Sequence, residues 1–521
     1  MVSHARNGRL SPIQMTIRTN FGSIVIPCIL LVLLLVISSS LAKGILPAKE
    51  VCVTCNCLKG IGFAENQVEV SIDCSQKQLV ELPVDWPFNM TKGEDLEDAK
   101  LVVSFSGNQL GTLRKLPATR AKNVSLSFRY CGLTELVSGA FLDVPFLERL
   151  DLSCNSLTTE SIHGDVFRGH YDTRSYEPLP LRTLLLTKNS LTNGLSALSL
   201  EHMPDLRILD LSYNHMGELS DGTVIAITTV KKLETLDLSH TGISFLPDRI
   251  MKSLPNLVEL SVRGNNFLSV PASIRIAANT LIKLDFSNNP VTTIEKKSFQ
   301  SMMKLQQLNL NHMMNLTAIK ESAFADLSSL RVLRMSKCPN LQYIHNMAFV
   351  DPKLRENSWT IEELHLENNN LTTLPKLMRD WPPLKALNLK NNPWNCKCSL
   401  AYIIATHHNA TKQSLARCKT PYERAGTLLT SIAKDFCVVT RLFNDDDDDD
   451  TVTQTNISGK PISRYSRPAV ITALVIFALT LAILGATLGY LGSCLRERLR
   501  RRSSQPIKYT HIRSSIISNN A

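Results

Sequence analysis

The cysteines are the residues of this chain that most clearly predict chemistry. Two groups flank the middle of the chain: Cys52, Cys55, Cys57 and Cys74 precede it, and Cys396, Cys398, Cys418 and Cys437 follow it. Thiols at such spacings can hold zinc or join in disulfides. The apolar run Ile24–Ile37 precedes both groups and has the character of a secretory signal. Disulfides are therefore the favoured interpretation, and zinc is the alternative.

The other reactive residues do not predict catalysis. The 12 histidines are scattered, and the sequence has no nucleophile elbow, phosphate-binding loop or zinc-binding helix motif. His407 and His408 lie within the second cysteine group, where a solvated helix face is favoured over a metal site. We predict that the chain is not an enzyme and that it has no catalytic residue, metal site or cofactor.

The segment 100–394 repeats one phrase with apolar residues at positions one, four, six and eleven and often Asn at position nine. Most steps between copies are 23 to 25 residues, and three are 27, 31 and 34 residues. This pattern is the leucine-rich repeat signature, and it predicts an α/β solenoid, a horseshoe with a parallel β-sheet on its concave face. The twelve copies start at Lys100, Asn123, Leu147, Leu181, Leu206, Leu233, Leu257, Leu281, Leu305, Leu330, Ile361 and Leu384.

Several repeat positions are expected to stabilise the solenoid itself. The ninth-position asparagines should turn inward and satisfy backbone groups that the turn leaves unpaired; they are Asn108, Asn155, Asn189, Asn214, Asn265, Asn289, Asn369 and Asn392. Phenylalanines in the return loops should fill the convex side of the core, namely Phe141, Phe299, Phe324 and Phe349. Aspartate at position five also matches the repeat consensus and is interpreted as scaffold, at Asp151, Asp210, Asp237 and Asp285.

Three further cysteines lie inside the repeats. Cys131 and Cys338 replace Asn at position nine and are expected to be buried thiols. Cys154 occupies position eight, one coil after Cys131. A Cys131–Cys154 disulfide is conceivable, although the two side chains should point in opposite directions.

The net charge of +11 is concentrated at the two ends of the chain, because residues 1–42 contribute +3 and residues 494–521 contribute +6. Nucleic-acid binding is therefore not predicted. Ala469–Leu491 contains no charged residue and is long enough for a membrane-spanning helix. Five arginines between Arg496 and Arg502 mark the following side as cytoplasmic. We predict a type I, single-pass plasma-membrane protein with extracellular repeats.

These boundaries predict seven segments. They are a signal peptide (1–42), an N-terminal cysteine-rich cap (43–99), the solenoid (100–394), a C-terminal cysteine-rich cap (395–438), an acidic stalk (439–468), a transmembrane helix (469–491) and a short basic cytoplasmic tail (492–521). An uncleaved signal anchor is the alternative for the first segment, and weak calcium binding is the alternative for the Asp445–Asp450 run. The Gly485-x-x-x-Gly489 spacing would allow a homodimer. In the tail, Cys494 is a candidate for palmitoylation, Ser503 and Ser504 for phosphorylation, and Tyr509 for a sorting signal.

Both cysteine groups resemble those of known extracellular proteins. Cys52-x-x-Cys55-x-Cys57 followed by Cys74 is similar to the N-terminal flank of extracellular leucine-rich repeat proteins. Asn392-Pro-Trp-Asn-Cys-Lys-Cys398 resembles the C-terminal flank of Toll ectodomains, Slit and neuronal adhesion proteins. This resemblance implies the pairs Cys52–Cys57, Cys55–Cys74, Cys396–Cys418 and Cys398–Cys437.

The layout of the whole chain resembles single-pass adhesion proteins of the tartan and capricious type. The resemblance implies recognition of an extracellular or cell-surface protein through the concave face. A non-signalling co-receptor or decoy receptor in innate immunity, or for ligand capture, is the alternative. The short tail leaves no room for a signalling domain.

The outward positions carry the candidate contacts. The sequons predict N-glycosylation at Asn89, Asn123, Asn315, Asn370, Asn409 and Asn456. None of them falls at an outward strand position, and Asn123, at position one, is expected to face inward. Thr159–Pro180 is interpreted as a surface-loop insertion. The candidate ligand-binding residues are Arg129, Tyr130, Tyr213, His240, Arg263, His312, Arg334, Lys337, His365 and Glu367.

Overall fold

The computed structural model describes residues 51–61, 68–86, 99–350 and 360–435. The chain divides into two units, 1–435 and 436–521, and all described residues belong to the first. The predicted signal peptide, stalk, membrane helix and tail lie outside the described residues. The same holds for Asn89, Cys437, Asn456, Cys494, Ser503, Ser504 and Tyr509. Within the described ranges, no helix is both long enough and apolar enough to span a membrane.

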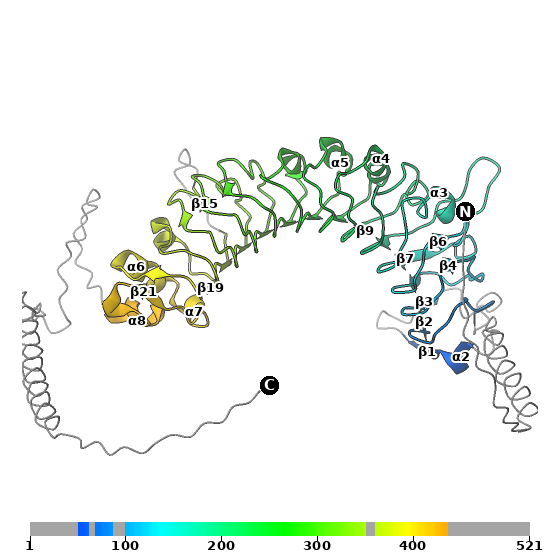
Figure 1. Ribbon diagram of the computed structural model, residues 1–521, viewed down its shortest axis with the longest axis horizontal. Helices are drawn as coiled ribbons and strands as arrows, with labels where there is room; N and C mark the ends of the chain where they lie inside the picture. Colours follow the sequence, from blue (N-terminus) through cyan, green and yellow to red (C-terminus); the bar gives the residue numbers. More distant parts are fainter. Residues whose placement is uncertain (1–50, 62–67, 87–98, 351–359, 436–521) are drawn as a thin grey trace, which may run out of the picture. The chain divides into compact units, whose positions relative to one another are not determined.

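Fourteen strands of the described residues form one sheet (Figure 1). In sheet order they are β1 (Asn56–Ile61), β2 (Val68–Asp73), β3 (Lys100–Ser104), β5 (Val124–Ser127), β7 (Leu147–Asp151), β8 (Thr183–Leu185), β9 (Ile208–Asp210), β10 (Thr235–Asp237), β11 (Glu259–Ser261), β12 (Lys283–Asp285), β14 (Gln307–Asn309), β16 (Val332–Arg334), β18 (Glu363–His365) and β19 (Ala386–Asn388).

Each of the twelve phrases provides one strand, from β3 to β19, and these strands pair in parallel. The leucines at position four stay in register from coil to coil: Leu236 pairs with Leu260, and Leu260 pairs with Leu284. Each coil can thus bury its apolar side only against its neighbours. The predicted solenoid with a parallel sheet is confirmed.

The sheet continues into the N-terminal cap. The repeat pattern did not predict this continuation of the sheet. β1 and β2 form an antiparallel hairpin, and β2 pairs in parallel with β3. The short helix α2 (Val51–Thr54) precedes this hairpin. The cap thereby covers the edge of the sheet that the first coil would otherwise expose.

The return segments lie on the opposite side of the coils from the sheet (Figure 1). They contain α3 (Gly164–Phe167), α4 (Asp221–Thr229), α5 (Asp248–Ser253), η2 (Ala272–Ala277) and η3 (Lys376–Asp380). They also contain two small parallel sheets, one of β4 (Thr112–Leu113) and β6 (Glu135–Leu136), the other of β13 (Thr293–Ile294), β15 (Ala318–Ile319) and β17 (Tyr343–Ile344).

Stacked aromatic rings fill the core on this return side. Phe299 stacks on Phe324 with ring centroids 5.9 Å apart, and Phe324 contacts Phe349 at 5.1 Å. The four predicted phenylalanines are all buried. Phe167 of α3 also belongs to this core, because it stacks on Phe141 at 5.7 Å. The insertion Thr159–Pro180 is therefore not wholly a surface loop.

The first two phrases depart from the expected pattern of inward residues. Their strands alternate strictly, so Leu101 and Val124 enter the core and Lys100 is half-buried. Asn123 precedes β5 with a φ of 66° and is also half-buried. The prediction that Asn123 faces inward is therefore wrong. Both strands are longer than most of the later ones, and a regular pleat turns every second side chain inward.

The ninth-position asparagines join neighbouring coils as predicted. Asn265 donates hydrogen bonds from its amide nitrogen to the carbonyls of Leu238 (2.8 Å) and Val262 (3.0 Å). Its oxygen accepts from the backbone nitrogens of Thr241 (3.1 Å) and Gly242 (2.9 Å) on the preceding coil. The turn of each coil is thereby satisfied by a side chain of the next.

Cys131 and Cys338 are buried free thiols at the same position. Their sulfurs donate to the carbonyls of Phe105 (3.1 Å) and Leu310 (3.4 Å), which lie on the preceding coils. Burial raises the pKa of both thiols, that of Cys338 to about 11. Cys154 is also free and half-buried, so the alternative Cys131–Cys154 disulfide is not formed.

The cysteine groups form disulfides in both caps. The bonds Cys52–Cys57, Cys55–Cys74 and Cys396–Cys418 are the pairs that the resemblance implies. Cys398 is also disulfide-bonded, and its predicted partner, Cys437, lies outside the described residues. The C-terminal cap consists of β20 (Trp394–Asn395), α6 (Cys398–Thr406), α7 (His408–Thr411), β21 (Cys418–Thr420), η4 (Tyr422–Arg424) and α8 (Leu429–Asp435).

His407 does not lie on a solvated helix face, because its side chain is buried between the cap and the last coils. Nδ1 accepts a hydrogen bond from the Leu384 nitrogen (3.3 Å), and Nε2 lies 2.9 Å from the Met378 carbonyl. Only a neutral ring that is protonated at Nε2 satisfies both contacts. Burial accordingly lowers the pKa of His407. The neighbouring His408 is half-buried.

Candidate protein-binding face

The outward side chains at positions three, five, seven and eight of the twelve coils form what we call the sheet face. At position eight the backbone of every coil has a positive φ, between 53° and 75°. This left-handed conformation costs side chains other than Gly and Asn roughly 1–2 kcal/mol. Seven of the twelve positions nevertheless carry Tyr, His, Lys or Cys. Five of the predicted ligand residues lie at this turn: Tyr130, Tyr213, His240, His312 and Lys337.

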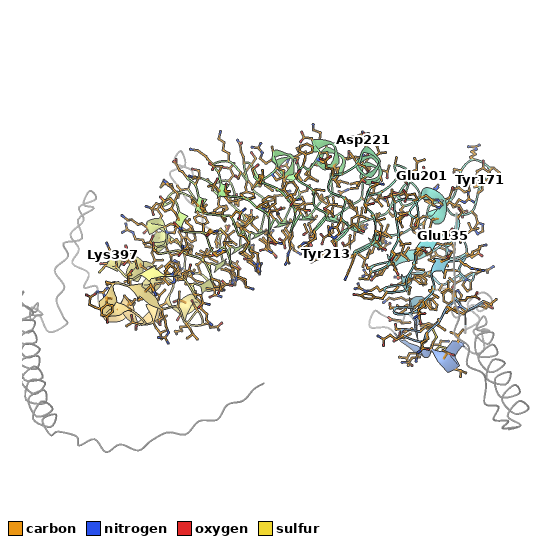
Figure 2. All side chains as sticks on the ribbon, viewed as in Figure 1. Glu135, Tyr171, Glu201, Tyr213, Asp221 and Lys397 are labelled. Atoms are coloured by element: carbon orange, nitrogen blue, oxygen red, sulfur yellow. A yellow bond between two sulfur atoms is a disulfide. The ribbon has the colours of Figure 1, made fainter. Side chains whose placement is uncertain are left out.

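Tyr213 and His240 form the most ordered contact of this face. Their rings stack with centroids 4.3 Å apart and an interplanar angle of 16°. The His240 ring covers Gly264 on the next coil, where an added Cβ would clash with it. Tyr213 remains 47% exposed, and Figure 2 places it on the sheet side of the coils. The sequence places these two aromatic residues at position eight of consecutive phrases, but that spacing alone does not predict that the rings stack.

The imidazole ring of His240 does not use all of its hydrogen-bonding capacity. Its Nε2 atom is buried and has no hydrogen-bond partner among the described residues. Burial lowers the pKa of His240, and the positive charge of Arg263 lowers it further. Arg263 is exposed at position seven of the coil that contains Gly264.

The face continues over the following coils. His312 is half-buried, and Lys337 on the next coil is exposed. Burial lowers the pKa of His312, as do the positive charges of Lys337 and Arg263. Arg334 lies 3.9 Å and His365 lies 3.5 Å from the carboxylate of Glu363. Glu367 on the same coil has one buried oxygen without a hydrogen-bond partner in the part of the chain that the structure describes.

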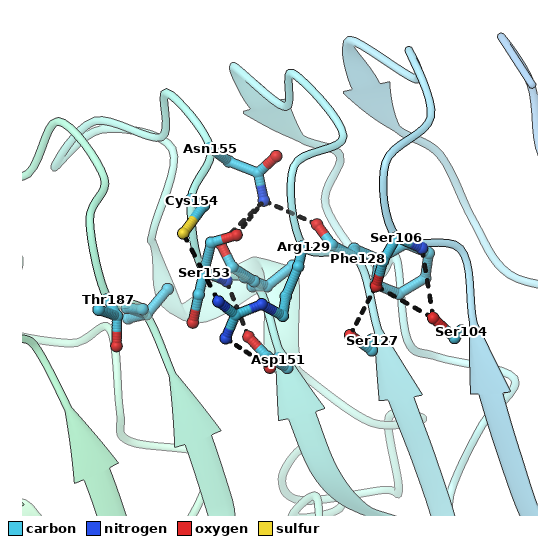
Figure 3. A network of polar contacts seen from close by, with 12 residues as sticks. Ser104, Ser106, Ser127, Phe128, Arg129, Asp151, Ser153, Cys154, Asn155 and Thr187 are labelled. Carbon is cyan, nitrogen blue, oxygen red and sulfur yellow. Dashed lines mark hydrogen bonds and ion pairs between the residues drawn. The ribbon is translucent and has the colours of Figure 1, made fainter. Parts of the chain in front are cut away.

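Arg129 and Tyr130 lie apart from this group, because β7 and β8 separate their coil from that of Tyr213. Arg129 lies 3.6 Å from the Asp151 carboxylate and 3.8 Å from the Cys154 sulfur (Figure 3). Its guanidinium also lies over the Tyr130 ring, 5.7 Å from the centroid. Eight of the ten predicted residues thus lie along the coils from β9 to β18, and the contact of Arg129 with Cys154 was not predicted.

A row of serines continues from this second cluster toward the N-terminal cap. The hydroxyl of Ser106 lies 3.0 Å from those of Ser104 and Ser127 (Figure 3). Ser104 in turn contacts Ser75 of the cap at 2.8 Å. These hydroxyls satisfy one another along the sheet face.

The aspartates at position five serve the scaffold, as expected. Asp210, Asp237 and Asp285 each accept a hydrogen bond from the backbone nitrogen two residues later, at 2.9, 2.7 and 2.9 Å. Burial raises the pKa of Asp237, partly opposed by Ser239, and the charges of Asp210 and Asp285 raise it too. Asp237 and Asp285 line a shallow hollow of about 290 Å³ together with Gln307 and Arg334.

The described sequons leave the sheet face uncovered. Asn315 and Asn409 are exposed, and Asn123 and Asn370 are half-buried. Asn315 and Asn370 follow the position-nine residue of their coils, and Asn409 belongs to the C-terminal cap. Their use for glycosylation stays a prediction.

Comparisons with known proteins support the repeat assignment. The family model described as "Leucine rich repeat" matches residues 255–313. The chain is a leucine-rich repeat protein. It is 25% identical to Tsukushi of Gallus gallus over 350 residues, which cover 65% of this chain and 78% of Tsukushi. Its relatives come from extracellular leucine-rich repeat families.

Other relatives of this leucine-rich repeat protein are matched over smaller parts. Toll-like receptor 2 type-2 of Gallus gallus is 28% identical over 31% of this chain and 22% of its own length. Chaoptin of Drosophila melanogaster is 27% identical over 40% of this chain and 15% of its own length. A solved leucine-rich repeat protein of Leptospira interrogans has a TM-score of 0.42 at 22% identity, covering 62% of this chain and 81% of that one.

Proposed function

We propose that this protein is a cell-surface recognition or adhesion protein that binds another protein through its sheet face. The observation that supports this most is the group of outward side chains around the Tyr213–His240 stack. Tyr213 and Arg263 are exposed there, and both residue types favour interface hot spots because they combine contact area with directed hydrogen bonds. Large side chains at a left-handed turn also cost backbone energy that a purely structural role would not require.

The predicted signal peptide, stalk and membrane helix are part of the same proposal. A signal at 1–42 would deliver the chain to the secretory pathway, and 469–491 would hold it as a type I membrane protein with the repeats outside. Residues 439–468 would separate the solenoid from the membrane. The disulfides of both caps support an oxidising compartment.

The experiment asks what the full-length protein binds when it is displayed on cells. Cells that express it are mixed with cells that express the same protein, with cells that express other membrane proteins, and with soluble secreted or microbial ligands. Aggregation with either cell type supports adhesion. Binding to soluble ligands alone supports the alternative, ligand capture as a non-signalling co-receptor, which the partial similarity to a Toll-like receptor favours. Absence of protein binding in all three arms would contradict both functions.

A further inference from the structure

Four basic side chains follow one another along the sheet face, and we call them the basic row: His240, Arg263, His312 and Lys337. They belong to the coils of β10, β11, β14 and β16, and the coil of β12 between them presents Asn288. Neighbouring strands lie about 4.8 Å apart, so the row is about 19 Å long. Glu367, on the coil of β18, ends the row.

The basic row has no direct ionic partner in the described part of the protein, although the charge of Asp285 acts on His240. None of its four side chains forms an ion pair or a side-chain hydrogen bond with another described residue, whereas the nearby Lys283 pairs with Glu259 and Arg334 lies near Glu363. Arg263 and Lys337 are exposed. The positive charges of Arg263 and Lys337 lower the pKa of the neighbouring histidines, so an anion that approaches the row would be attracted to both exposed cations.

We propose that the basic row binds an extended acidic segment of a partner protein, an inference that rests on the proposed function of the sheet face. An extended segment of about six residues spans the length of the row. Asp237 and Asp285 lie beside the basic row on the same sheet. A densely sulfated glycan, with charge on all sides, would meet these carboxylates. An extended peptide with acids at every second position places all of them on one face, because its side chains alternate between two faces.

Binding of an acidic segment would be coupled to protonation. His312 faces Lys337 and Arg263, and His240 faces Arg263, His215 and Asp285. An anion that neutralises Arg263 and Lys337 removes the repulsion that contributes to the low pKa of both histidines. Their pKa values are then higher in the complex than in the free protein, so the complex binds more protons. The affinity for the segment should therefore rise as the pH falls from about 7.5 to about 6.

The test uses the full-length protein in detergent micelles, and the probe is a fluorescent six-residue peptide in which Glu alternates with Ser. Asp445–Asp450 are changed to Asn in every sample, so that the acidic run of the chain does not compete. Arg263→Ala combined with Lys337→Ala should weaken binding at least tenfold and remove most of its pH dependence. Arg149→Ala combined with Lys188→Ala removes the same charge from the coils of β7 and β8 and should change the affinity less than twofold.

Three results would overturn the inference: no peptide binding by the parent protein, equal losses in both double variants, or binding of a heparin fragment in place of the peptide. Thermal melting checks that both double variants are folded. The proposed function is tested in a separate experiment, which measures capture of a cell-surface partner. If that capture depends on the sheet face while the peptide does not bind, only the acidic-segment inference fails.

Discussion

Single residues decide how one coil is joined to the next, and Asn265 shows this most fully. Its amide satisfies backbone groups of two neighbouring coils, and its side chain is only 3% exposed. The next residue, Asn266, is exposed and donates one hydrogen bond, to the Gly242 carbonyl at 2.7 Å. The two asparagines therefore form a matched pair that differs in burial and in the number of bonds.

Asn265→Ala should destabilise the repeats by about 3 kcal/mol, because several buried backbone groups lose their partner at once. Asn266→Ala should cost less than about 1 kcal/mol, because water can replace the single exposed bond. Chemical denaturation measures both changes, and hydrogen exchange should show faster opening at the coils of β10 and β11 in the first variant. Equal stabilities of the two variants would contradict the bridging role of the ninth-position residue.

The free cysteines should differ in reactivity with a thiol reagent. Cys154 is half-buried, whereas Cys131 and Cys338 are fully buried and the pKa of each is raised by burial. In the native protein, a bulky maleimide should modify Cys154 many times faster than Cys131 or Cys338, because only an accessible thiolate reacts. Peptide mapping after labelling gives the rates, and labelling after denaturation is the control. Fast native labelling of Cys338 would show that its coil opens.

The inward residues could largely be predicted from spacing alone, since positions four, six and nine each have one direction in the coil. The outward contacts could not. Stacking of Tyr213 on His240 depends on the left-handed turn at position eight, and the approach of Arg129 to Cys154 depends on where that turn directs the thiol. Neither backbone angle is apparent from an apolar repeat pattern.

At the scale of elements, the two caps close the solenoid in different ways. The N-terminal hairpin extends the sheet itself, through backbone pairing of β2 with β3. The C-terminal cap packs helices against the last coils and uses buried polar groups, among them His407. The sequence predicted both caps through their cysteines. It gave no sign that β1 and β2 join the sheet or that His407 is buried, because strand pairing and helix orientation depend on tertiary contacts.

His407 should make the stability of the C-terminal cap depend on pH. Burial lowers its pKa in the folded protein, so below the ordinary value of 6.5 the unfolded chain binds a proton that the folded cap does not. Stability should therefore be full above about pH 7 and should decrease as the pH falls through 6.5 toward the lower folded-state pKa.

Hydrogen exchange in α6 as a function of pH measures this effect. In His407→Gln the slope between pH 7.5 and pH 5.5 should largely disappear. At high pH the cap of this variant should be less stable than that of the parent, because the amide replaces the ring imperfectly. His408→Gln is the control, and it should keep the slope. An unchanged slope in His407→Gln would show that another group is responsible.

At the scale of the whole molecule, the described coils have a sheet side and a return side with different characters. The sheet side carries the Tyr213–His240 stack and the basic row, and the described sequons lie outside its outward strand positions. On the return side, the hairpin that contains Tyr171 and Tyr176 is also exposed (Figure 2). The two sides therefore offer alternative binding surfaces, which can be compared in one protein.

The most direct measurement compares partner binding by three forms of the full-length protein displayed on cells at equal density. The sheet-face variant carries Tyr213→Ala, Arg263→Ala and Arg334→Ala. The control carries the same types of change on the return side, Tyr171→Ala, Arg174→Ala and Arg249→Ala. We expect the sheet-face variant to lose about 2 kcal/mol or more of binding free energy, roughly a 30-fold increase in Kd, and the control to match the parent. Unchanged binding by the sheet-face variant, or loss in the control alone, would contradict the central claim.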